Sequence, residues 1–79
     1  MKMTNMNEVH DFERTVKECK GDVWAMNDKH EYDLKSGVER RIAIGKMLDE
    51  NASELEIFCA RNEDEMNMFE FMAKHPEMN

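Results

Sequence analysis

The sequence contains few residues that break, cross-link or stiffen a chain. Its 79 residues include one proline, three glycines and two cysteines, and aromatic residues make up 8%. Cys19 and Cys59 lie far apart in the sequence, each on a face expected to be buried, so we expect no disulfide framework. Free buried thiols suit a reducing compartment, and we therefore expect a cytoplasmic protein.

Basic residues and long apolar runs are also scarce. Lysine and arginine number 11 against 18 acidic residues, a formal net charge of −7. The only basic cluster is Lys35 with Arg40 and Arg41. Because a phosphate backbone requires clustered positive charge, we expect no nucleic-acid partner. No apolar run approaches the roughly 20 residues that span a membrane, and the first residues lack the apolar stretch of a signal peptide. We expect no membrane association.

A chain of this length forms one domain, residues 1–79. Asn5, with Glu8 three residues later, predicts a capping box at the start of a first helix, and Gly21 suits the position just past its end. Apolar residues then recur at helical spacing. They are Met6, Val9, Phe12, Val16 and Cys19.

Two further capping signals predict two more helices. Ser36 with Glu39 opens the second, and Asn62 with Glu65 opens the third, which Pro76 ends. The inner face of the second helix is expected to consist of Val38, Ile42, Gly45 and Leu48, widened by Ile44 and Met47. That of the third is expected to consist of Met66, Phe69, Met72 and Ala73.

The segments between the helices predict strands. Residues 22–26 and 31–34 flank turn residues and indicate an antiparallel hairpin. In the segment Glu54 to Ala60, apolar Leu55, Ile57 and Cys59 alternate with Glu54, Glu56 and Phe58, a third strand. The order α-β-β-α-β-α predicts an α+β fold with three helices on one face of a small antiparallel sheet.

The central part of the chain resembles the bacterial phosphocarrier protein HPr. The resemblance lies in Asp22-Val23, a hairpin, and Tyr32-Asp33-Leu34-Lys35-Ser36 opening the second helix. The later stretches SELEIFCA and Asn-Glu-Asp-Glu are similar to that family's last strand and last helix. The resemblance covers residues 5–74 and implies an HPr-like two-layer open-faced sandwich whose first strand is short or absent, since only Met1 to Thr4 precede the first helix.

The phosphorylation site of the family is not retained. Its histidine stands in a His-x-Arg-Pro motif at a helix N-terminus, but the ungapped register places Asn5 there, with Asn7 and Glu8 at the arginine and proline positions. An amide cannot carry phosphate by that mechanism, and Glu8 would repel it. His10 is the nearest histidine and the alternative phosphoacceptor, although its place on the polar side of the helix also fits an ordinary surface histidine.

Ser36 corresponds to a serine that a regulatory kinase modifies in family members from Gram-positive bacteria. The resemblance implies a regulatory phosphorylation site, and a phosphate at a helix N-terminus is electrostatically favourable. The alternative is a plain helix cap. The pair of large apolar residues that docks partners in the family is replaced by Gly37 and Val38.

The family's first strand pairs with the strand that corresponds to Glu54 to Ala60. We therefore expect a protein partner or self-association along this strand. The preferred interpretation is a non-catalytic, HPr-like regulatory or protein-interaction domain related to the phosphoenolpyruvate-dependent sugar phosphotransferase system. The alternatives are an active phosphocarrier using His10, or a structural subunit completed by a partner strand.

The sequence leaves the roles of the methionines and of Trp24 open, and it indicates no catalytic, cofactor or metal site. The nine methionines suit either a small adaptable core or a binding surface, and Trp24 suits either the core or an exposed sheet face. No catalytic motif stands out, so we expect no enzyme and no cofactor. We also expect no metal, because short metal-ligand spacing is absent among the residues His10, His30, His75, Cys19 and Cys59.

Overall fold

The helices and strands occur in the predicted order. The structure is a computed structural model that describes residues 1–78. Its elements are α1 (Met6–Glu18), β1 (Val23–Met26), β2 (Glu31–Asp33), α2 (Gly37–Leu48), β3 (Glu56–Cys59) and α3 (Asn62–Lys74). The prediction of a small α+β fold with three helices and an antiparallel sheet is confirmed. In residues 1–78 no helix has both the length and the apolar character that crossing a membrane requires.

The sheet has the strand order β2-β1-β3, and both pairings are antiparallel. The predicted hairpin is β1–β2, in which Ala25 lies opposite Tyr32. On the other side of β1, Trp24 lies opposite Phe58 and Val23 opposite Cys59. Both β2 and β3 are therefore edge strands.

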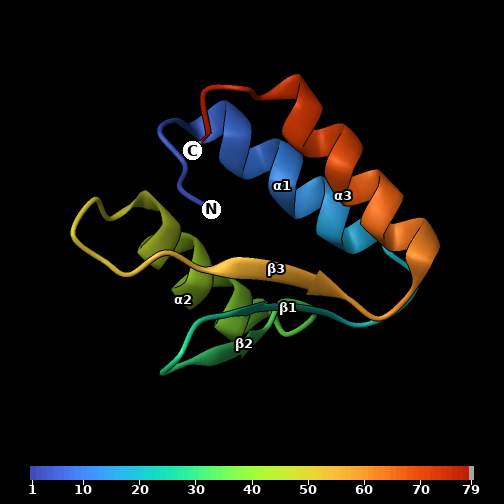
Figure 1. Ribbon diagram of the computed structural model, residues 1–79, viewed down its shortest axis with the longest axis horizontal. Coiled ribbons are helices and arrows are strands. Elements are labelled where there is room, and N and C mark those ends of the chain that lie inside the picture. The colour runs from blue at the N-terminus through green and yellow to red at the C-terminus, as the bar shows by residue number, and fades with distance from the viewer. Residues whose placement is uncertain (79) are drawn as a thin grey trace.

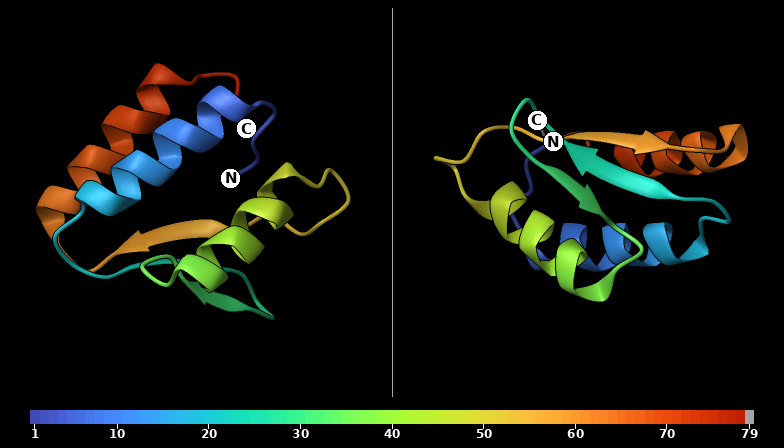
Figure 2. Two further views of the ribbon diagram at one scale, coloured as in Figure 1. Left: turned by 180° about the vertical axis from the view of Figure 1, so that it is seen from behind. Right: turned by 90° about the horizontal axis from the view of Figure 1, so that it is seen from below.

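The helices leave one face of the sheet open. In Figures 1 and 2, α1 and α2 lie on the same side of the strands, and α3 runs beside α1 and next to β3. Val23 and Ala25 point into the core on the covered side. Phe58 is exposed and Trp24 half-buried on the opposite side, which places Trp24 on the open face.

The first helix follows its capping signal closely. The Glu8 amide donates to Asn5 Oδ1 at 3.0 Å, and the Asn5 amide donates to Glu8 Oε1 at 3.3 Å. Val9, Phe12 and Val16 are buried as predicted, but Met6 is exposed. Glu8 takes the buried side of the first turn instead, because its carboxylate is held there by the cap.

The second helix buries only part of the predicted face, because Ile44 and Met47 are buried as expected and the other predicted residues are not. Val38, Ile42 and Leu48 are exposed, and Gly45 has open space around it. The buried residues are Ala43, Ile44 and Met47. Arg40 explains the rotation, because its guanidinium donates to the Leu34 carbonyl at 3.0 Å and pairs with Glu13 on α1. The side of α2 that carries Arg40 therefore turns inward.

The third helix is also rotated, and its predicted cap is wrong. Met66 and Phe69 are each 65% exposed, whereas Met68 and Phe71 are buried. Residue Arg61, not Asn62, occupies the cap position, and it makes no side-chain cap bond.

Asp64 accounts for the orientation of α3. Its carboxylate is buried and accepts hydrogen bonds from the backbone N–H groups of Lys20 at 3.0 Å and Gly21 at 2.8 Å. A side chain on Gly21 would meet Arg61 Cγ at 2.6 Å. Gly21 is thus needed for close approach of the α3 start, and not for a left-handed turn after α1.

Candidate functional site

The N-terminus of α1, where the resemblance places the lost phosphocarrier site, is filled by a carboxylate of the chain itself. Glu8 is 0% exposed, and its Oε1 accepts bonds from the Thr4 amide at 2.6 Å, the Thr4 hydroxyl at 3.1 Å and the Asn5 amide. Burial opposes the charged form of Glu8, but the bonds from Thr4 outweigh it, and the pKa of this carboxyl lies below its usual range. A buried carboxylate that already bonds to Thr4 and Asn5 therefore lies beside the position of Asn5, and its charge would repel a phosphate there.

His10 lies in the middle of α1 and is exposed. At a mid-helix position the neighbouring backbone N–H groups bond within the helix, so they cannot bind a phosphate. This position gives His10 none of the anion-binding surroundings that a phosphoacceptor uses.

Ser36 is the N-cap of α2, as predicted. Its backbone is extended, and its Oγ accepts from the Glu39 amide at 3.4 Å. The capping box is incomplete, because Glu39 Oε1 accepts from the Asp33 amide at 3.0 Å and not from Ser36. The Ser36 amide donates instead to the Asp33 carbonyl at 3.1 Å.

The structure does not bring Asn5 and Ser36 together. The Met3 amide donates to the Met47 carbonyl at 2.9 Å, which places the segment before Asn5 at the C-terminal end of α2. Ser36 precedes the opposite end of the same helix. At about 1.5 Å per residue, the length of α2 lies between them.

The strand β3 has one bonded side and one free side. The Ala60 amide donates to the Asp22 carbonyl at 2.9 Å, and antiparallel strands direct alternate residues to the same neighbour. Phe58 therefore bonds to β1, whereas the N–H and C=O groups of Ile57 and Cys59 point the other way. The end of α3 lies beside this edge, and the Met1 ammonium donates to the Leu55 carbonyl at 2.5 Å and lies 3.6 Å from Glu54.

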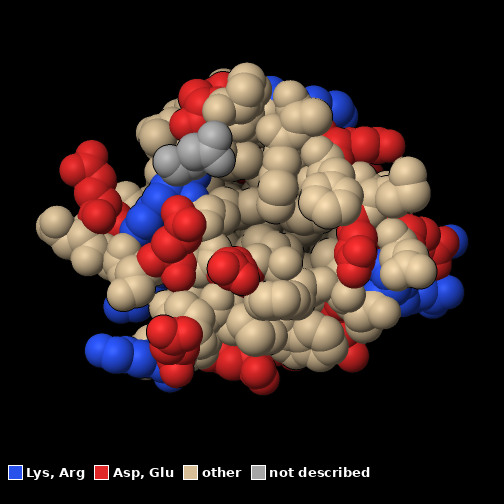
Figure 3. Space-filling view, in the orientation of Figure 1, with Lys and Arg blue, Asp and Glu red and all other residues tan. Residues whose placement is uncertain are grey.

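A groove runs beside this free edge. It encloses about 310 Å³ between β3, the end of α3 and the chain termini. Apolar side chains predominate in its walls, among them Met1, Ile57, Met72 and Met78. Figure 3, which views the open face, shows a broad uncharged area interrupted and bordered by acidic side chains. Met3 and Met47 are core residues, as one of the two interpretations of the methionines expected, and Met72 lines the groove.

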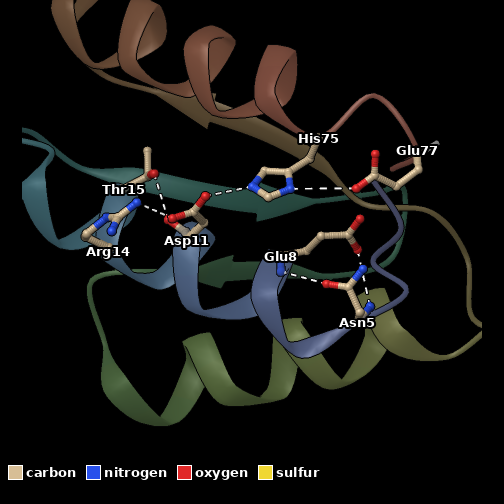
Figure 4. A network of polar contacts seen from close by, with 7 residues as sticks. All are labelled: Asn5, Glu8, Asp11, Arg14, Thr15, His75 and Glu77. Carbon is tan, nitrogen blue, oxygen red and sulfur yellow. Dashed lines mark hydrogen bonds and ion pairs between the residues drawn. The ribbon is translucent and has the colours of Figure 1, made fainter.

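A third feature, absent from the sequence predictions, joins the two ends of the chain. Glu8, His75 and Glu77 each offer one potential ligand atom, and these three atoms lie within 4.8 Å of one another. Figure 4 shows the group, with Asp11 on the far side of the His75 ring. The hydrogen bond from His75 lowers the pKa of Asp11, and the Arg14 charge lowers it further. No local spacing signals this group, because its members come from opposite ends of the sequence.

The two cysteines are free thiols. Burial, and to a smaller extent the neighbouring Cys19, raise the pKa of Cys59 to about 11. The pKa of Cys19 is raised by burial as well. Both are therefore protonated at neutral pH and poor nucleophiles.

Comparison of the chain with protein-family models, curated proteins and solved structures gave no match.

Proposed function

We propose that this chain is a non-catalytic, HPr-like protein-interaction domain that binds an extended segment of a partner along the free edge of β3. The observation that carries the proposal is the outward direction of the Ile57 and Cys59 backbone groups beside an apolar groove. Free N–H and C=O groups on an edge strand are the template for strand addition, and an adjacent groove supplies side-chain selectivity.

The arrangement of elements supports the HPr-like part of the proposal. The order α-β-β-α-β-α and the sheet β2-β1-β3 are what an HPr-like domain without its first strand would have. The free side of β3 is the side on which that strand would pair. Ser36 caps the start of α2, where the resemblance expects the family's regulatory serine, and this supports a relation to sugar phosphotransferase regulation.

The loss of phosphocarrier chemistry follows from Glu8. A phosphate beside Asn5 would lie next to the buried Glu8 carboxylate, which already accepts bonds from the Thr4 amide, the Thr4 hydroxyl and the Asn5 amide and would repel a second anion. His10, the alternative acceptor, is exposed in the middle of α1. Neither position offers both an acceptor nitrogen and a place for the phosphate.

The edge defines the chemistry of the partner segment. Residues of an added strand alternate between two faces, one over the groove, whose walls are mainly apolar but include Glu56, and one over the open side of the sheet. Glu54 and Glu56 are exposed along this edge. The first set should be apolar and the second basic, because the domain carries a net charge of −7. The same charge disfavours a second copy as the occupant, since two such edges bring like charges together.

Amide exchange and two peptides test the proposal. In the free protein the Ile57 and Cys59 amides should exchange rapidly, whereas the Phe58 amide, in the same strand but directed at β1, should be protected. A peptide of alternating valine and lysine should slow the exchange of Ile57 and Cys59. A peptide of the same length with glutamate in place of lysine is the control and should have no effect.

Three results would contradict it. Protected Ile57 and Cys59 amides in a strict monomer would mean that the edge is already covered. Protection that grows with protein concentration, with a dimer in sedimentation, would make a second copy the occupant. If the lysine peptide does not slow amide exchange at millimolar concentration, the proposed partner, an extended segment of alternating apolar and basic residues, is wrong. A structural subunit, the alternative that uses the same edge, predicts an isolated chain that is unfolded without its partner.

A further inference from the structure

The group formed by Glu8, His75 and Glu77 contains a buried oxygen with no partner. Glu8 is 0% exposed, and its Oε1 accepts three hydrogen bonds from Thr4 and Asn5. Within residues 1–78, Glu8 Oε2 has no hydrogen-bond partner. Figure 4 shows this free oxygen directed toward the Glu77 carboxylate. A buried acceptor facing a second carboxylate is costly unless a cation or a proton lies between them.

The orientation of His75 completes the group. Its Nε2 lies 2.7 Å from Asp11 Oδ2, and its Nδ1 lies 3.8 Å from Glu77 Oε1. Asp11 accepts only, so Nε2 carries a proton, and in the neutral ring the lone pair of Nδ1 faces Glu77. A carboxylate that fixes the outer nitrogen of a histidine is the usual second partner of a metal-binding imidazole.

We propose that Glu8, His75 and Glu77 bind a divalent transition-metal ion of the Zn²⁺ type, with Glu8 Oε2, His75 Nδ1 and a Glu77 oxygen as ligands and Asp11 as the residue that positions His75. An imidazole nitrogen with two carboxylates suits zinc, whereas magnesium and calcium prefer oxygen alone. The His75 side chain is 13% exposed and that of Glu77 is 54% exposed, so one side of the site is open to water as a fourth ligand.

The proposal is independent of partner binding, although His75 also lines the groove. The sequence predicted no metal site, because its histidines and cysteines lack the short spacing of metal ligands. That criterion does not detect two glutamates and a histidine from opposite ends of the chain. A bound ion would attach the segment after α3 to the first turn of α1. It would therefore stabilise the folded chain in proportion to its affinity and concentration.

Zn²⁺ and thermal unfolding at neutral pH test the site. Zn²⁺ should raise the Tm of the parent chain, and Mg²⁺ at the same concentration should not. Glu77→Gln removes an exposed ligand with little effect on folding, and His75→Gln removes the nitrogen ligand. Each should weaken zinc binding at least about tenfold, since even outer partners of metal ligands are worth about 10–100-fold in affinity. His10→Gln, an exposed histidine on α1, is the matched control and should bind zinc like the parent.

Two further measurements distinguish zinc at this site from zinc bound to a thiol and identify the role of Asp11. The thiols are competing zinc ligands, so the titration is repeated with Cys59→Ser, which should still respond. The ring ¹⁵N shifts of His75 should show the proton on Nε2 in the parent and a tautomer mixture in Asp11→Ala, which identifies Asp11 as the positioning residue. If a proton shared by Glu8 and Glu77 takes the place of the ion, Zn²⁺ should not stabilise the parent, and the proposal fails. It fails equally if His75→Gln responds to Zn²⁺ like the parent, or if Mg²⁺ stabilises as strongly.

Discussion

Ile42 and Ile44 allow a direct test of how α2 packs. The two residues are identical and two positions apart on one helix, and the sequence pattern assigned both to its inner side. In the structure Ile44 is 7% exposed and belongs to the core, whereas Ile42 is 47% exposed. Truncation to alanine therefore deletes the same atoms at both positions, and the two variants differ in how deeply those atoms are buried.

The expected losses differ by more than the error of an unfolding experiment. Truncation of a buried isoleucine to alanine costs about 2–5 kcal/mol, part of which is the cavity left behind. Ile42→Ala removes atoms that are about half in water already, for about 1 kcal/mol. Alanine then recovers a few tenths of a kcal/mol, roughly 0.4, through its better helix propensity. Ile44→Ala should thus be less stable than Ile42→Ala by about 2 kcal/mol.

Urea unfolding followed by the far-UV signal of the helices measures the difference. With a slope of about 1 kcal/mol/M, typical of a small domain, the midpoints should be separated by about 2 M. Ile44→Val, expected to cost about 0.5–1.5 kcal/mol, serves as the milder variant if Ile44→Ala does not fold. Equal losses at the two positions, or a larger loss at Ile42, would show that α2 packs through the face that the sequence pattern predicted and would refute the observed rotation.

Three other predictions concern phosphorylation, the Ser36 cap and the charge of Asp64. Incubation with phosphoenolpyruvate and the general phosphotransferase enzyme should give no acid-labile phosphate, and labelling that disappears in His10→Ala would contradict the proposal of a non-catalytic domain. Ser36→Ala should lower the free energy of unfolding in urea by about 0.5–2 kcal/mol, and Ser36→Asp should leave it almost unchanged. An Ala variant as stable as the parent would contradict a capping role for Ser36. Hydrogen bonds from the Gly21 and Lys20 amides lower the pKa of Asp64 despite its burial. Its contribution is therefore present above the unfolded pKa near 3.8 and lost as pH falls through the folded pKa. The stability difference between parent and Asp64→Asn should shrink on acidification, whereas Asp28→Asn, in an exposed turn, should change little at any pH; a difference constant with pH would contradict the role of the Asp64 charge.

The sequence alone determined the features that depend on neighbouring residues. The caps at Asn5 and Ser36 and the stop before Pro76 were predictable, because a cap requires only a side chain and a backbone amide a few residues apart. The hairpin followed from alternation around turn residues, and the order of the elements then favoured an α+β fold.

Only the tertiary structure decided which face each helix buries and which distant residues meet. Both α2 and α3 carry apolar residues on more than one side, so periodicity could not select between faces. The choice came from long-range hydrogen bonds, Arg40 to the Leu34 carbonyl and Asp64 to the Gly21 amide, which are satisfied in one rotation of each helix. The same reason applies to Glu8 and His75, because their approach depends on α1 and α3 packing side by side, which no local spacing in the sequence encodes.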